Sequence, residues 1–128
     1  MKRILSVIVF MVVSISASAE WVGIAKTNQG DTFYADPLTR MQTNYSVKIW
    51  ILADYKVPDI VSDKKYYSTK SQIEFKCKSS ELRYLYILGF PEQLGQGKAR
   101  ELLSDPDKWT PIVPGSAFSD LLLFACKT

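Results

Sequence analysis

The sequence of 128 residues contains two cysteines, Cys77 and Cys126, and they fall in segments with different hydrophobic periods. Apolar and polar residues alternate over 67–78, which predicts a β-strand with Cys77 on its apolar face. After a Pro114-Gly115 turn and a favourable N-cap at Ser116, helical spacing places Cys126 on one stripe with Phe118, Leu121, Leu122 and Ala125. A bond between the cysteines would therefore pin a short C-terminal helix across one face of a sheet.

The first residues have the pattern of an export signal. Met1-Lys2-Arg3 is basic, residues 4–15 are almost unbroken apolar, and Ser16-Ala17-Ser18-Ala19 supplies the small residues of a cleavage site. The apolar run of about 12 residues is shorter than the ~20 that span a bilayer, which disfavours an N-terminal membrane anchor. We expect residues 1–19 to be a cleaved signal peptide and residues 20–128 to form one mature domain without a transmembrane segment.

Export bears on the cysteines and on the charge. An oxidising compartment favours a Cys77–Cys126 disulfide. The alternatives are two free thiols or a metal site with two soft ligands, whereas zinc usually takes four, so we expect no metal. The 16 basic residues become 14 when Lys2 and Arg3 are removed, against 13 acidic residues. A nearly neutral, exported domain is a poor candidate for binding nucleic acid.

Short turn signals separate the alternating segments and predict antiparallel strands joined by hairpins. Two of these expected turns are Asp36-Pro37 and Val57-Pro58-Asp59. The strand candidates are residues 21–27, 32–35, 45–55, 67–78, 82–90 and 99–103. Together with the C-terminal helix they indicate an α+β domain.

Several motifs, in order along most of the mature chain, resemble the bacterial surface-adhesin protein E-like family. They are Tyr34-x-Asp36-Pro37-x-Thr39, Val47-Lys48-x-Trp50-x-Leu52-x-Asp54-Tyr55-Lys56, Ser68-x-Lys70-x-Gln72-x-Glu74-Phe75-x-Cys77-Lys78 and Trp109-x-Pro111-x-Val113-Pro114-Gly115-Ser116. The resemblance implies a twisted antiparallel sheet of about six strands, with the C-terminal helix on its concave face and tied there by the disulfide. It also implies binding of host extracellular matrix or plasma proteins.

The chain contains no histidine, which removes Ser-His and Cys-His dyads and the commonest metal ligand. Acid–base chemistry would then rest on carboxylates such as Asp54, Asp59, Glu74 and Glu81. We interpret these as strand and turn residues, and we predict a non-enzymatic binding protein without a cofactor. A small carboxylate-dependent hydrolase is the less favoured alternative.

Large aromatic and lysine side chains on the central strands suggest a binding face, because one short helix cannot cover both faces of a sheet. The candidate binding residues are Trp50, Lys70, Lys76, Tyr84 and Tyr86. The expected partner is a protein of the host extracellular matrix or of the bacterial envelope. The expected location is the periplasm or the bacterial cell surface.

Other interpretations of this face remain open. Trp21, Trp109 and the long loops could cover it. It could instead form a homodimer, which is modestly supported by Leu123 and Phe124 lying largely off the expected buried stripe of the helix. A periplasmic housekeeping or envelope-stress role without a host partner is the second functional hypothesis.

Overall fold

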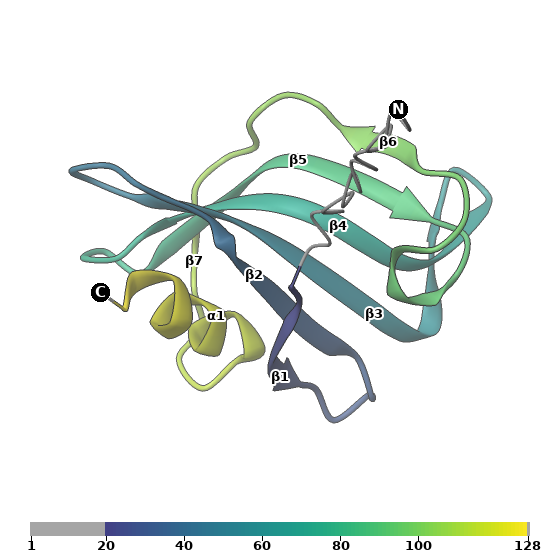
Figure 1. Ribbon diagram of the computed structural model, residues 1–128, viewed down its shortest axis with the longest axis horizontal. Coiled ribbons are helices and arrows are strands. Elements are labelled where there is room, and N and C mark those ends of the chain that lie inside the picture. Colours follow the sequence, from purple (N-terminus) through teal and green to yellow (C-terminus); the bar gives the residue numbers. More distant parts are fainter. Residues whose placement is uncertain (1–19, 128) are drawn as a thin grey trace, which may run out of the picture.

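The computed structural model describes residues 20–127, and the signal peptide expected for residues 1–19 lies outside the described residues. These residues form one antiparallel sheet in the order β1-β2-β3-β4-β5-β6, with β7 also paired to β5 (Figure 1). The elements are β1 (Val22–Lys26), β2 (Thr32–Gln42), β3 (Val47–Val61), β4 (Lys64–Lys76), β5 (Glu81–Phe90), η1 (Gln93–Gly95), β6 (Arg100–Leu103), β7 (Thr110–Pro111) and α1 (Ala117–Cys126). The α+β class is confirmed, and the two-residue β7 adds a seventh strand to the six expected.

The helix α1 packs on one face of the sheet, against β1, β2, β3 and β4 (Figure 1). Leu121 and Ala125 of the helix are almost completely buried there. Alternate residues of the central strands supply the other side of this core, namely Val47, Ile49, Ile51, Ala53, Ile73 and Phe75. Because a strand directs successive side chains to opposite faces, this packing also defines which side chains lie on the face away from the helix. Within residues 20–127, no helix is long and apolar enough to cross a membrane.

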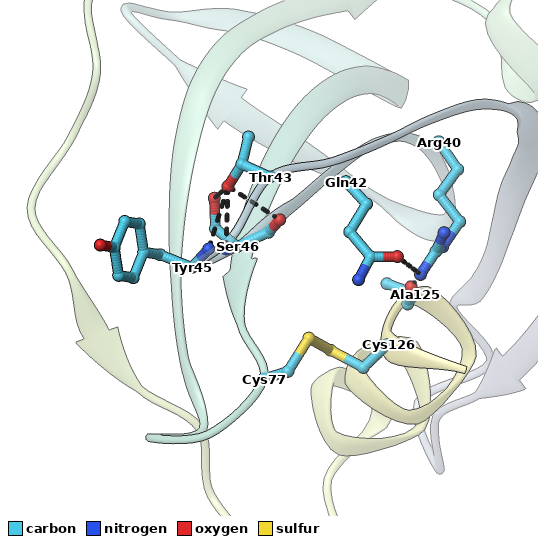
Figure 2. The surroundings of a disulfide bond; sticks show 8 residues. All are labelled: Arg40, Gln42, Thr43, Tyr45, Ser46, Cys77, Ala125 and Cys126. Atoms are coloured by element: carbon cyan, nitrogen blue, oxygen red, sulfur yellow. Dashed lines mark hydrogen bonds between the residues drawn. A yellow bond between two sulfur atoms is a disulfide. The ribbon is translucent and has the colours of Figure 1, made fainter. Parts of the chain in front are cut away.

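Both ends of α1 are held by specific contacts. The Ser116 hydroxyl accepts a hydrogen bond from the Ser119 N–H at 3.3 Å, which confirms the expected N-cap. At the other end, Arg40 Nε of β2 donates to the Ala125 carbonyl at 2.7 Å (Figure 2). This contact puts a cation at the negative end of the helix and satisfies a carbonyl that has no partner within the helix.

The expected disulfide is confirmed. Cys77 follows β4 and Cys126 ends α1, with their Cα atoms 5.8 Å apart across a sequence separation of 49 residues (Figure 2). The bond fastens the C-terminal end of the helix to the end of a central strand. Leu123 is 70% exposed, as expected, whereas Phe124 packs against the core, so its expected position off the buried stripe is wrong.

The two turns expected at prolines are wrong, because both segments lie inside long strands. At Asp36-Pro37 the pairing of β2 with β3 shifts register between Asp36 and Met41. Pro37 has no N–H for the ladder, and the Thr39 hydroxyl accepts the N–H of Trp50 at 2.9 Å. The same hydroxyl donates to the Asp36 carbonyl at 2.7 Å. The Asp-Pro-x-Thr motif therefore builds a bulge that keeps the strand continuous.

The second proline segment behaves in the same way. Val57-Pro58-Asp59 lies within β3, where the register with β4 shifts between Asp54 and Asp59. The chain reverses instead at Ser62 and Asp63, which have positive φ angles of 50° and 64°. The hairpin between β3 and β4 consequently extends well past the part of the sheet that α1 covers (Figure 1).

Candidate binding face

The face of the sheet opposite α1, called here the open face, carries three rows of side chains in register across β3, β4 and β5. The rows are Lys48–Glu74–Arg83, Trp50–Gln72–Tyr86 and Leu52–Lys70–Leu88. Side chains directly opposite one another on neighbouring strands are close enough to interact. The open face therefore has one charged row, one aromatic row and one row of mixed character. The mixed row is partly covered by η1, because Leu52 is only 1% exposed and lies beside Gly95.

The aromatic row brings together two of the candidate binding residues. The rings of Trp50 and Tyr86 lie edge to face, with centroids 6.1 Å apart and an interplanar angle of 67°. Both residues are half-buried. The Tyr86 hydroxyl donates a hydrogen bond to the Glu101 carboxylate on β6, and this bond, with burial as a smaller cause, raises the pKa of Tyr86. The result is an aromatic surface whose orientation is set by the sheet and by one hydrogen bond.

The two candidate lysines lie on either side of this row, and each meets aromatic rings. Lys70 Nζ lies 5.1 Å from the centroid of Phe90 and 5.9 Å from that of Trp21. Lys76 Nζ lies 4.1 Å from the centroid of Trp109. Ammonium groups are attracted to the faces of aromatic rings. Trp21 and Trp109 thus meet the two ends of the open face, and Trp50 and Tyr86 remain half-exposed between them.

A partly buried ion pair supports the charged row. Arg83 Nε donates to Glu74 Oε1 at 2.7 Å, and the Ser46 hydroxyl donates to Glu74 Oε2 at 2.7 Å. Burial tends to raise the pKa of Glu74, but the hydrogen bonds from Ser46 and Arg83 outweigh it and leave the pKa below its ordinary value. Arg83 also lies against Trp109, with Cζ 4.5 Å from the ring centroid. This network makes Glu74 a structural carboxylate that anchors the face.

Tyr84 does not belong to this face, contrary to the expectation from simple alternation. Its partner on β4 is Ile73, whereas Tyr86 pairs with Gln72, so Leu85 is an extra residue in a bulge. One inserted residue turns the following side chains to the opposite face. Tyr84 therefore lies on the face of the sheet that α1 covers and packs against the core there, and burial raises the pKa of its hydroxyl.

On that inner face Tyr84 helps to line a cavity of about 340 Å³, together with Tyr55, Thr69, Asp59 and Asp107. The Tyr55 hydroxyl is 3.1 Å from the Thr69 hydroxyl, and burial raises the pKa of Tyr55. Asp59 and Asp107 share the cavity, but both are exposed, whereas a carboxylic acid catalyst is typically set up by an apolar environment.

The other candidate carboxylates have structural partners. Asp54 accepts the N–H of Leu94 at 2.8 Å, and Glu81 lies 3.7 Å from Lys76 Nζ. Among residues 20–127 there is no group of three or more cysteine, aspartate or glutamate side chains placed to hold a metal ion. The residues that sequence reasoning did not include in the site are Gln72 and Arg83. Alternation along β4 could have identified Gln72, but Arg83 and Tyr86 share the open face only because of the bulge at Leu85.

A tethered helix on one face of an antiparallel sheet and an aromatic row on the other define a class of small α+β domains. The profile of the family described as surface-adhesin protein E matches residues 21–127. The chain therefore belongs to the surface-adhesin protein E family. No curated protein matches the chain in sequence.

Solved structures of Haemophilus influenzae protein E share this fold. Crystal form II has a TM-score of 0.65 at 13% identity, covering 87% of this chain and 90% of that chain. A second structure has a TM-score of 0.62 at 13% identity, covering 87% and 86%. Protein E from a non-typeable strain has a TM-score of 0.55 at 12% identity, covering 87% and 78%. At such identities the similarity shows a common fold.

Proposed function

We propose that the protein is an exported, adhesin-like binding protein that recognises a protein of the extracellular matrix or of the bacterial envelope through its open face. Membership of the surface-adhesin protein E family supports an adhesin-like role. The observation that carries the proposal is the half-exposed Trp50–Tyr86 pair at the centre of that face. Aromatic residues surrounded by polar groups are typical centres of protein interfaces.

The flanking residues of the open face suit the same role. Lys70 and Lys76 are held near aromatic rings and stay half-exposed, so they can meet acidic groups of a partner around the aromatic centre. Tyr84 is not part of the proposed surface, because it packs on the other face of the sheet. The proposed site therefore consists of Trp50, Lys70, Lys76 and Tyr86, with Gln72 between the two rings.

Export is part of the proposal. We infer that residues 1–19 are a signal peptide cleaved after Ala19, and that residues 20–128 are the mature domain. The Cys77–Cys126 disulfide supports this inference, because disulfides persist mainly in oxidising compartments. Mass spectrometry of the purified mature protein should therefore find Glu20 at the N-terminus. An intact Met1 would contradict cleavage.

Binding to immobilised extracellular matrix proteins and to a bacterial envelope fraction tests the function. Trp50→Ala is expected to weaken binding of the partner at least tenfold, as for a buried aromatic contact at the centre of an interface. Tyr45→Ala is the matched control, because Tyr45 is an 86% exposed aromatic residue on the β2–β3 hairpin, outside the open face. Equal binding by wild type and by the Trp50→Ala variant, with both proteins folded, would refute the proposed site.

Two further measurements separate the alternatives. Protease treatment of intact cells should digest the protein if it acts as a surface adhesin, whereas complete protection inside the periplasm would favour a periplasmic envelope role. Light scattering at high protein concentration tests whether the open face pairs with a second copy. A monomer would rule out the homodimer.

A further inference from the structure

A basic cleft lies at the end of the sheet remote from α1. Its volume is about 410 Å³, within the range of small-molecule sites. The β3–β4 hairpin forms one wall with Lys64 and Lys65. The other wall is formed by Lys98, in the segment leading into β6, and by Arg100, the first residue of β6. Figure 1 shows these two segments side by side at the right of the view. The sequence places the two walls more than 30 residues apart, so only the fold brings their charges together.

The positive charge of this cleft is not neutralised within it. Its lining contains four cationic side chains and no acidic one. The ion pairs found within residues 20–127 are Lys76–Glu81 and Arg83–Glu74, and neither involves the cleft. The nearby Glu101 accepts the hydroxyl of Tyr86. Because the mature chain is nearly neutral, four cations in one cleft, without an ion pair to any residue of 20–127, form a local concentration of charge.

The backbone holds the cleft in shape. Tyr66, which is 4% exposed, lies at its base, and a Cβ added at Gly89 would be 2.7 Å from Tyr66 Cδ1. Pro91 lines the cleft near Gly97, where an added Cβ would be 2.7 Å from Pro91 Cγ. Gly97 also has a φ of 90°, a conformation that glycine adopts at little cost. Tight packing at these glycines makes the cleft a preformed feature.

From this arrangement we propose that the cleft binds sulfate groups of a linear polysaccharide. Arginine binds such oxyanions through two parallel hydrogen bonds, and lysine adds compact positive charge. Cations on two facing walls suit a chain that carries sulfates on both of its sides, with the exposed Pro91 ring beneath its sugars. A lipid surface is less suitable, because a planar bilayer meets protruding side chains better than the lining of a recess. This site is separate from the Trp50–Tyr86 surface.

Calorimetry with a heparin-derived hexasaccharide tests the proposal on the purified protein expressed from its full chain. Lys98→Gln/Arg100→Gln is expected to weaken binding at least tenfold. Lys26→Gln/Lys127→Gln is the matched control, because it removes the same charge from exposed positions at the end of β1 and after α1. The control should bind within about twofold of wild type, and affinity should fall as salt rises from about 50 to about 200 mM. Fully desulfated hexasaccharide should not bind.

Several results would overturn the proposal. One is that the wild-type protein does not bind the hexasaccharide. Another is that the cleft variant and the control variant lose hexasaccharide affinity equally. Binding to phosphatidylglycerol vesicles that depends on the cleft, while hexasaccharide binding does not, would assign the site to lipid instead. If the first cleft variant fails to fold, Lys64→Gln/Lys65→Gln on the opposite wall provides the same test, since both residues are exposed.

Discussion

Removal of the disulfide should cost a large share of the stability of this domain. The perturbation is the double substitution Cys77→Ala/Cys126→Ala, which leaves no free thiol behind. Cys77 is exposed and Cys126 is half-buried, so truncating the side chains loses little buried surface. The main effect is then on the unfolded chain, which gains the freedom that the cross-link had removed.

The size of the effect follows from the loop that the bond closes. For a sequence separation of 49 residues, the chain-entropy relation corresponds to about 4 kcal/mol at 25 °C. Domains of this size typically have about 5–15 kcal/mol of stability in total. Unfolding entropy of about 2.1 cal/mol/K per residue converts this loss into a fall in Tm of roughly 18 °C. The packing of Leu121 and Ala125 should keep α1 docked in the variant, because both side chains are buried independently of the bond.

Urea and thermal unfolding followed by circular dichroism measure the loss. Wild type in reductant should behave like the double variant, and reductant should leave the variant itself unchanged. An increase of the m-value in the variant would show that its unfolded state has expanded. A loss of less than about 1 kcal/mol, with an unchanged m-value, would refute the view that the cross-link acts on the unfolded chain.

Three further substitutions and one control test the packing and electrostatics. Glu74→Gln should lower the free energy of unfolding by about 2 kcal/mol at neutral pH in urea titrations, because Arg83 then faces a neutral partner. The folded-state pKa of Glu74 lies below the ordinary 4.5, so the stability that the carboxylate contributes is complete above pH 4.5 and is lost as pH falls through the folded-state pKa. If wild type and Glu74→Gln differed in free energy of unfolding by the same amount at about pH 2 as at pH 7, this reasoning would be contradicted. Gly89→Ala should lower the free energy of unfolding by about 1–3 kcal/mol, because the added Cβ overpacks the site. Gly23→Ala is its control: a Cβ added there would come no closer than 3.7 Å to its neighbours, so the urea midpoint should change little. Ser116→Ala should cost about 1 kcal/mol through loss of the N-cap, and an unchanged Tm would show that the cap is dispensable.

The strand pattern predicted the position of most elements but not the irregularities within them. The proline at Pro37 is a turn signal in a linear sequence, yet the strand continues because the Thr39 hydroxyl accepts the N–H of Trp50. Alternation over 82–90 placed Tyr84 beside Tyr86, and the inserted Leu85 separated them onto different faces. These differences have one cause, since a bulge depends on the partner strand and leaves no periodic signal in its own segment.

The candidate site was predictable to a similar degree. Trp50, Lys70 and Lys76 share the open face, as period-two alternation along two strands predicts. The rings that meet the lysines, Trp21 and Trp109, come from distant segments, and only their possible role as cover could be anticipated. The basic cleft was not anticipated, because Lys98 and Arg100 are far in sequence from Lys64 and Lys65.

The sequence by itself determined the features that depend on local periodicity or on a single covalent bond. These are the C-terminal helix with its Ser116 cap, the alternating central strands and the pairing of Cys77 with Cys126. Only the tertiary structure decided the register between strands, the face on which Tyr84 lies and the side chains gathered around the two candidate binding surfaces. The physical reason is that helix and strand periods arise within one segment, whereas register and surface clusters arise from contacts between segments far apart in the chain.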